Sequence, residues 1–398
     1  MTELKKNPPQ PGHRIESIDI LRGIVMVIMA LDHVRDFFHN DSLTGHDPLS
    51  LDTTWPLLFF TRWITHFCAP VFVFLSGTSV FLYSQRRRTK RQVAFFLFTR
   101  GIWLMLAEIF IVNYLWEFGF GYFLMLQVIW TIGLSMVILS LLQFLPYKVL
   151  LIVGLIIVFG HNLLDGVRVE QPFIASFGWS VVHVFHPYQI PPHLTLVVAY
   201  PFLPWLGLMI MGYCLGKLYT NETGASYRKK FLLTTGIAVT CFFIVLRFTD
   251  FYGDMDNWKM QKTTLYTLFD FLDTTKYPPS LLFMSMTIGP ALIVLATIEN
   301  VSNRMSQIVM IYGKVPFFYY LLHVFVIHSF AILLNLATGR QNVSIDFTRP
   351  METRADVGYP LWTVYLVWIV VIIVLYFPCK WYSRYKASHY QNKWLSYL

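Results

Sequence analysis

The chain has 398 residues, of which 56% are hydrophobic and only 13% are charged. Soluble globular domains carry about 25% charged residues, so this composition excludes an ordinary soluble protein. The net charge of +9 does not indicate nucleic-acid binding, because the basic residues lie in short stretches between apolar runs, where positive-inside topology expects them. The apolar runs are continuous rather than alternating, which favours helices over a β-barrel.

The sequence therefore predicts an all-α polytopic membrane protein. About ten apolar segments are long enough to cross the hydrocarbon layer of roughly 30 Å. A polar tail over 1–16 precedes a single transmembrane domain over 17–380, and a basic tail over 381–398 follows it. The predicted spans are 17–38, 57–83, 93–115, 121–143, 147–163, 196–218, 230–249, 279–298, 308–335 and 360–380.

The basic clusters predict the orientation of the chain. They lie on the same side as the N-terminus, and lysine and arginine are enriched in cytoplasmic loops. Both termini are therefore expected to be cytoplasmic, in a multi-pass protein of the bacterial cytoplasmic (inner) membrane. The clusters are Lys5/Lys6, RRRTKR at 86–91, YRKK at 227–230 and the basic residues of the C-terminal tail.

The first predicted span ends in a group of ionisable residues, which are costly at membrane depth and tend to be functional. Asp32, Arg35, Asp36 and His39 form one helical stripe, and His33 lies beside Asp36. A carboxylate that orients an imidazole makes a general base. We expect catalysis from His33, Asp32, Asp36 and His39; the alternative is a set of interface residues at a helix end.

Arg22 lies at the other end of the same span. It precedes His33 by eleven residues, on nearly the same helical face and about 16 Å away along the axis. A ligand with a charged head at Arg22 and a reacting end at His33 needs a long, thin arm. The pantetheine arm of an acyl-CoA has this shape.

The opening of the chain and five further stretches in chain order carry a family resemblance. The opening RIESIDILRGIVMVIMALDH resembles that of the transmembrane acyltransferase superfamily, with a histidine eleven residues after the arginine. The closer resemblance is to the heparan-α-glucosaminide N-acetyltransferase catalytic-domain-like family of bacterial membrane proteins. The further stretches are DHVRD at 32–36, PVFVFLSGTSVFL at 70–82, YPFLPWLGLMIMGYCLG at 200–216, KYPPSLLF at 276–283 and YGKVPFFYYLLHVFVIH at 312–328.

The resemblance implies acyl transfer from a cytoplasmic acyl-CoA, acetyl-CoA foremost, to an acceptor across the membrane. The lysosomal member acetylates a glucosamine amine. That member has an asparagine at the position of His33, and its histidine comes some residues later, as His39 does here. Which of the two histidines is the base stays open, as does the acceptor, for which we expect a glycan or an amino sugar.

Further polar residues within the apolar segments complete the predicted site. Arg62 and His66 share a helical face at the depth of Asp32, so Arg62 is a candidate to neutralise that carboxylate. Together with Arg35 and His323 they are the expected substrate-binding residues. Arg22, Lys314 and Tyr319 are the expected acyl-CoA-binding residues. Each of these has a plain alternative as a structural polar contact between helices.

Arg100 and Glu108 are also intramembrane charges, and Gln127 is a candidate partner for them. The small residues of LSGTS at 75–79 let helices approach closely or, alternatively, form a groove wall for the CoA arm.

A metal is not expected. The four cysteines show no ligand spacing, and His183, His186 and His193 lie in an outer loop without a carboxylate or a helical frame. The expected partners are the lipid bilayer, acyl-CoA and the glycan acceptor, without nucleic acid; the assembly state is open, a homodimer being one option. Two rival functions remain: a proton-coupled small-molecule transporter, because intramembrane Asp, His and Arg also form proton relays, and a non-catalytic partner of another envelope enzyme.

Overall fold

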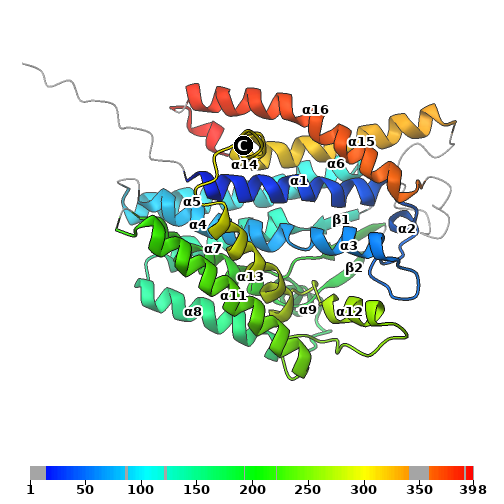
Figure 1. Cartoon of the computed structure of the whole chain (residues 1–398), viewed down its shortest axis with the longest axis horizontal. Coiled ribbons are helices and arrows are strands. Elements are labelled where there is room, and N and C mark those ends of the chain that lie inside the picture. The colour runs from blue at the N-terminus through cyan, green and yellow to red at the C-terminus, as the bar shows by residue number, and fades with distance from the viewer. Residues whose placement is uncertain are drawn as a thin grey trace, which may run out of the picture.

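The computed structural model describes residues 15–85, 88–120, 123–191, 193–220, 222–339, 358–389 and 391–397. Nearly all of the predicted N-terminal tail 1–16, and part of the basic cluster 86–91, lie outside these ranges. The described chain is a bundle of helices whose long axes run in a broadly common direction (Figure 1).

Every predicted apolar segment contains at least part of one helix. The helices are α1 (Glu16–Phe38), α2 (Asn40–Leu43), α3 (Pro56–Thr65), α4 (Cys68–Ser84), α5 (Lys90–Ala107), η1 (Glu108–Val112), α6 (Asn113–Glu117), α7 (Val128–Leu142), α8 (Tyr147–Gly160), η2 (His161–Leu164), α9 (Phe173–Val182), α10 (Phe202–Leu215), η3 (Gly216–Tyr219), α11 (Ala225–Thr249), α12 (Thr264–Leu272), α13 (Leu281–Thr297), α14 (Arg304–Lys314), α15 (Pro316–Ala337), α16 (Leu361–Ser388) and η5 (Lys393–Ser396).

Seven helices of the described chain are long and apolar enough to cross a membrane. This confirms a helical multi-pass membrane protein, whereas the count of about ten and the cytoplasmic termini stay predictions. Of the three remaining predicted spans, α7 and α13 are apolar but shorter. α1 has 23 residues, and its charged side chains set it apart from the apolar spans.

Four predicted boundaries need correction. The segment 121–143 begins as a strand, β1 (Phe123–Leu126), before α7. The segment 196–218 likewise begins within a strand, β3 (Leu194–Val198), before α10. The segment 308–335 is two helices, because Pro316 has no backbone N–H to continue α14, and Val315 leaves helical geometry. α16 continues through Ser388, so the predicted tail 381–398 begins as part of a helix.

A small sheet, which the sequence analysis did not predict, lies at the end of the bundle where α1 ends (Figure 1). Its order is β1-β3-β2, with β2 (His186–Ile190) antiparallel and β1 parallel to β3 (Leu194–Val198). Leu126 pairs with Val198. The parallel register therefore brings the residues that follow the two strands, Gln127 and Tyr200, to the same edge.

Glycines allow close helix packing around the site. A Cβ on Gly77 of α4 would lie 1.9 Å from the Met209 carbonyl oxygen of α10, and a Cβ on Gly212 would lie 1.8 Å from that of Phe74. In LSGTS, Gly77 and Thr78 thus face α10, and Thr78 donates to the Gly212 carbonyl at 2.8 Å. Only glycine permits backbones this close.

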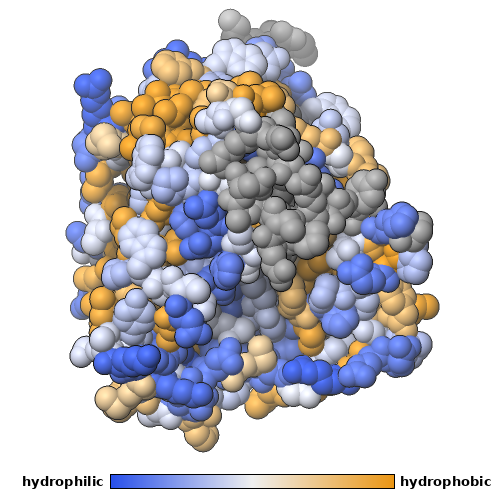
Figure 2. All heavy atoms as spheres, turned by 90° about the vertical axis from the view of Figure 1, so that its right-hand side faces the viewer, coloured by the Kyte–Doolittle hydropathy of each residue, from blue (hydrophilic) through white to orange (hydrophobic). Residues whose placement is uncertain are grey.

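Figure 2 shows the molecule from the end of the bundle that carries the sheet. Hydrophilic side chains gather along the lower rim of this end. The segment between α11 and α13 belongs to this end. Buried Arg247 donates to the carbonyl oxygens of Asp256, Asp270, Phe271 and Asp273, at 2.6–3.1 Å, and so ties the segment down. Sequence analysis did not single out this arginine.

Candidate active site

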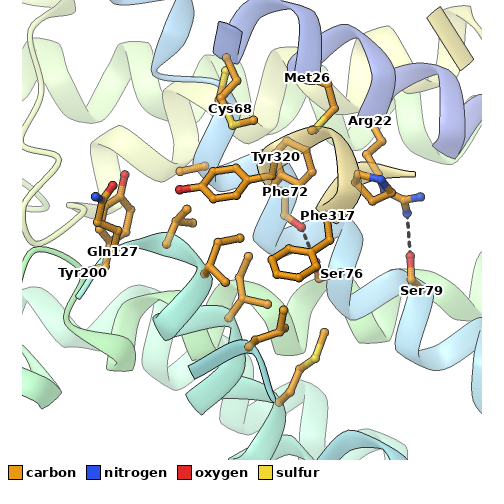
Figure 3. Close-up of a pocket in the computed structure, with 18 of the residues that line it drawn as sticks. Arg22, Met26, Cys68, Phe72, Ser76, Ser79, Gln127, Tyr200, Phe317 and Tyr320 are labelled. Atoms are coloured by element: carbon orange, nitrogen blue, oxygen red, sulfur yellow. Dashed lines mark hydrogen bonds between the residues drawn. The ribbon is translucent and has the colours of Figure 1, made fainter. Parts of the chain in front are cut away.

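A cavity of about 400 Å³ lies inside the bundle and joins the two ends of α1. Arg22 lines one end and His33 the other, and the two residues belong to the same helix. Figure 3 shows Arg22 and Ser79 at one end of the cavity and Gln127 and Tyr200 at the opposite end. The cavity is therefore elongated along the direction of α1.

The middle of the cavity is apolar. Phe72, Phe317 and Tyr320 point into it between the two ends (Figure 3). Methionine and aliphatic side chains complete this stretch; they are Met26, Met29, Leu97, Leu104, Val128, Ile129, Ile132 and Met136. A slender, largely apolar chain would match these walls.

The Arg22 end is basic. The Arg22 guanidinium donates to Ser79 Oγ at 2.8 Å, to the Gly313 carbonyl at 3.1 Å and to Asp19 Oδ1 at 3.1 Å. Arg100 and Lys386 also line this part of the cavity, as do Ser76 and Ser79 of LSGTS. One face of LSGTS thus packs on α10, and the other lines the cavity.

The other end of the cavity contains a pair of histidines. His33 Nδ1 lies 2.8 Å from His323 Nε2, although 290 residues separate them in sequence. The rings are stacked, with centroids 4.8 Å apart. Trp116 and Tyr320 pack edge-on against the His33 ring. His323 is fully buried, so its orientation is rigidly held.

The hydrogen bonds of His323 assign the tautomer of His33. His323 Nδ1 lies 3.0 Å from the Tyr319 carbonyl oxygen, which can only accept, so this nitrogen carries the proton. In the neutral ring Nε2 is then an acceptor, and His33 Nδ1–H donates to it. The lone pair of His33 is therefore on Nε2, the nitrogen not engaged by His323.

Asp32 is neutralised by arginines instead of holding His33. Arg62 Nη1 donates to both its oxygens, at 2.8 and 2.9 Å, which is the pairing that the sequence predicts. Arg35 Nη2 lies 2.9 Å from Asp32, and Thr65 Oγ1 donates to it at 2.9 Å. The hydrogen-bonded partner of His33 is thus an imidazole, where the sequence analysis expected a carboxylate.

Arg35 links the two carboxylates of the cluster. Its Nη2 lies 2.6 Å from Asp36 Oδ1. Asp32 and Asp36 are thereby balanced by Arg35 and Arg62, which stabilises four charges in a poorly solvated site. Among the described residues, Arg35 Nε and Nη1 have no hydrogen-bond partner.

His39 lies beyond the end of α1 and outside the described cavity lining. Its Nδ1 accepts from the Asp41 backbone N–H at 3.3 Å and caps α2. Burial lowers the pKa of His39, against the opposing effect of Asp41. Of the two candidate bases, His33 is the one that faces the cavity.

Seven other predicted residues are also absent from the described cavity lining. Four of them belong to the cluster around Asp32 and His33, namely Arg35, Asp36, Arg62 and His323. The other three are His66, Lys314 and Tyr319. His66 is buried against Phe283. Lys314 ends α14. Tyr319 is buried and stacks on His323, with ring centroids 5.1 Å apart, so it supports the histidine pair from behind.

Arg100 and Gln127 both line the cavity, whereas Glu108 does not. Glu108 is fully buried, and the backbone N–H groups of Ile129 and Trp130, in the first turn of α7, face it. A carboxylate at a helix N-terminus is a favourable arrangement. Glu108 thus lies beside the first turn of α7, although neither of its carboxyl oxygens makes a hydrogen bond to a described residue.

Sequence reasoning missed Lys276 and Tyr200, which line the His33 end of the cavity. Lys276 is among the charged neighbours of Asp32 and His33. Tyr277 packs edge-on against Tyr200, with ring centroids 5.4 Å apart. Burial would raise the pKa of Tyr277, but Lys276 and Arg62 hold it below its usual value. The stretch KYPP, quoted only for its resemblance, was the available signal.

Comparison with known protein families gives one match. A family model described as heparan-alpha-glucosaminide N-acetyltransferase, catalytic, matches residues 14–247, more than half of the chain. The match contains Arg22, Asp32, His33 and Arg62 and ends before Lys276 and His323. No curated protein matches the chain.

Proposed function

The chain belongs to the heparan-alpha-glucosaminide N-acetyltransferase catalytic family, and from this premise we propose that it moves an acyl group from acyl-CoA across the membrane to a sugar acceptor. Membership supports a membrane acetyltransferase-like activity. The acyl-CoA donor, the glycan or amino-sugar acceptor and the sidedness of the reaction are our proposal. Acetyl-CoA is the first donor to test.

The single observation that carries the proposal is the continuous cavity from Arg22 to His33. A donor with an anionic head, a slender arm and a reactive thioester finds matching chemistry along it in that order. Arg22, Arg100 and Lys386 supply cations for phosphates at one end. The apolar middle receives the arm, and the His33 end receives the thioester.

The reaction follows from the His33 tautomer. The lone pair on Nε2 accepts a proton from the acceptor's amine or hydroxyl as its nitrogen or oxygen attacks the thioester carbonyl carbon. The carbon–sulfur bond then breaks, and the CoA sulfur leaves with the electron pair and takes a proton. An acyl-histidine intermediate is the alternative route, in which Nε2 itself attacks the carbonyl.

The charges around His33 favour a developing negative charge. Arg35 and Arg62 balance Asp32 and Asp36, so Lys276 leaves the site with an excess of one positive charge. We assign to Lys276 the stabilisation of the carbonyl oxygen in the transition state. Arg62, Arg35, Asp32 and Asp36 then act as positioning residues.

The orientation completes the proposal. The Arg22 end faces the cytoplasm, where the basic clusters lie, and the His33 end faces outward, where a glycan is available. The bacterial cytoplasmic membrane is the proposed location.

The test uses the purified full-length protein with acetyl-CoA and a panel of amino sugars and polysaccharides. We expect acceptor-dependent release of CoA, which His33→Ala lowers by about 10²–10⁴-fold because a general base contributes this much. His46→Ala, at an exposed loop histidine, is the matched control and should keep wild-type activity. If no acceptor gives CoA release and the protein carries out proton-coupled solute flux in liposomes without CoA, the proposed acyltransferase function is wrong and a transporter function is supported.

A further inference from the structure

A second cluster of metal-ligating side chains lies outside the acyl-transfer cavity. His161 begins η2 at the end of α8, Asp165 follows η2, and His183 directly follows α9. One ligand atom from each of the three side chains lies within 4.8 Å of the others. The chain passes through an entire helix between Asp165 and His183, so tertiary folding brings the three together.

The histidines of this cluster are buried without adequate hydrogen bonds. His161 is 2% exposed, and neither of its ring nitrogens has a hydrogen-bond partner among the described residues. His183 is fully buried, and its Nδ1 also lacks a partner there. An unsatisfied buried polar atom costs free energy, so such groups need an explanation. A bound cation would use these lone pairs.

The carboxylate of the cluster is held as a metal ligand would be. Asp165 Oδ1 lies 2.8 Å from His183 Nε2, and Asn162 Nδ2 donates to Asp165 Oδ2 at 2.8 Å. Ligating carboxylates are commonly oriented by such an outer hydrogen bond. The Asp165 side chain is 14% exposed, so water can reach the cluster from one side.

We propose that His161, Asp165 and His183 bind one Zn²⁺ ion, with water as the fourth ligand. Two imidazoles and one carboxylate are a ligand set that zinc uses. Tetrahedral zinc with bonds of about 2.0–2.1 Å needs ligand atoms roughly 3.3 Å apart. To reach that value the Asp165–His183 contact of 2.8 Å would open, and the separations of up to 4.8 Å would shorten, through rotation of the side chains.

The bound ion would cross-link elements at this end of the bundle. It links the end of α8 to α9, which leads through β2 and β3 to Tyr200 of the cavity. Asn162 Oδ1 also accepts from the Leu281 backbone N–H at 2.9 Å, so the site reaches the first turn of α13, just after Lys276. The role is structural and does not rest on the proposed acyl transfer.

The cluster differs from the group His183, His186 and His193 that the sequence analysis considered for a metal site. His186 and His193 are exposed, and neither belongs to the cluster. His161 and Asp165 went unnoticed because they follow an apolar span and lie far from His183 in sequence.

The experiment measures metal binding by the purified, chelator-treated full-length protein. One Co²⁺ per chain should bind and give the visible bands of a tetrahedral site, and Zn²⁺ should abolish those bands and raise the unfolding temperature by several degrees. His161→Leu should fold, because an apolar side chain removes two unsatisfied nitrogens, yet lose both responses. His186→Ala is the matched control and should respond like the wild type.

Two results would overturn the site. The first is the absence of tetrahedral Co²⁺ bands and of a Zn²⁺-dependent thermal shift in the wild type. The second is a His161→Leu protein that folds and still shows both. Either would leave a hydrogen-bonded histidine–aspartate pair without an ion.

Discussion

Replacement of His323 tests how the histidine pair works. His323 Nε2 accepts the His33 Nδ1–H at 2.8 Å, and His323 is fully buried. When His33 takes up a proton on Nε2 it becomes an imidazolium, and the same hydrogen bond becomes charge-assisted and about twice as strong. An interaction that strengthens in the transition state raises kcat more than it changes KM.

The expected magnitude follows from the burial of the pair. A buried donor that loses its acceptor costs about 1–3 kcal/mol. Since 1.4 kcal/mol is a factor of ten, His323→Leu should lower kcat by roughly 5- to 150-fold. His323→Gln should recover most of the loss, because its amide oxygen reaches approximately the position of Nε2 and can accept the same proton.

The assay is steady-state release of CoA from acetyl-CoA with a saturating acceptor, alongside the unfolding temperature of each variant. A His323→Leu protein that folds and keeps the wild-type kcat, while His33→Ala is inactive, would refute the orienting role. Equal losses in His323→Leu and His323→Gln would refute the acceptor role specifically.

Three further predictions concern the Arg22 end of the cavity, the segment between α11 and α13, and the helix packing. Arg22→Gln should raise KM for acetyl-CoA about tenfold with little change in kcat, because it removes one charged contact far from the thioester; an unchanged KM contradicts the proposed head site. Burial raises the pKa of Asp273 to about 7, so the folded protein binds more protons than the unfolded chain between about pH 4 and 7 and loses stability as pH rises through this window. Asp273→Asn should therefore raise the free energy of unfolding at pH 8 by roughly 4 kcal/mol at most, and with it the unfolding temperature, with a gain that shrinks toward pH 4. A pH-independent gain argues against this carboxyl. Gly77→Ala should destabilise the protein by at least 1–3 kcal/mol, because its Cβ meets the Met209 carbonyl, whereas Gly178→Ala, with open space around it, should be neutral or stabilising in a thermal melt.

Much of the architecture was accessible from the sequence, because a membrane imposes a length and a polarity on each segment. All ten predicted apolar segments contain helices, and the charges that end the first span belong to the helix that lines the cavity. The pairing of Arg62 with Asp32 was also predictable, since opposite charges at one depth need each other. The small sheet was missed, because apolar strands have the same composition as spans. The segment 308–335 was predicted as one span, although Pro316 divides it into two helices.

Helical periodicity gives the face on which a side chain lies but not its neighbour across the bundle. His33 could have been held by Asp32, Asp36 or a residue of any facing helix. Packing selected His323, 290 residues away, while the arginines took the carboxylates.

The sequence by itself determined that the chain is a helical membrane protein with an ionisable site at the end of its first helix, because hydrophobic length and charge are local properties. Only the tertiary structure decided which groups meet: the two histidines, Lys276 and Tyr200 beside them, and the separate cluster of His161, Asp165 and His183. These contacts join distant segments, and their geometry depends on the packing of helices and of a short sheet that no local pattern encodes.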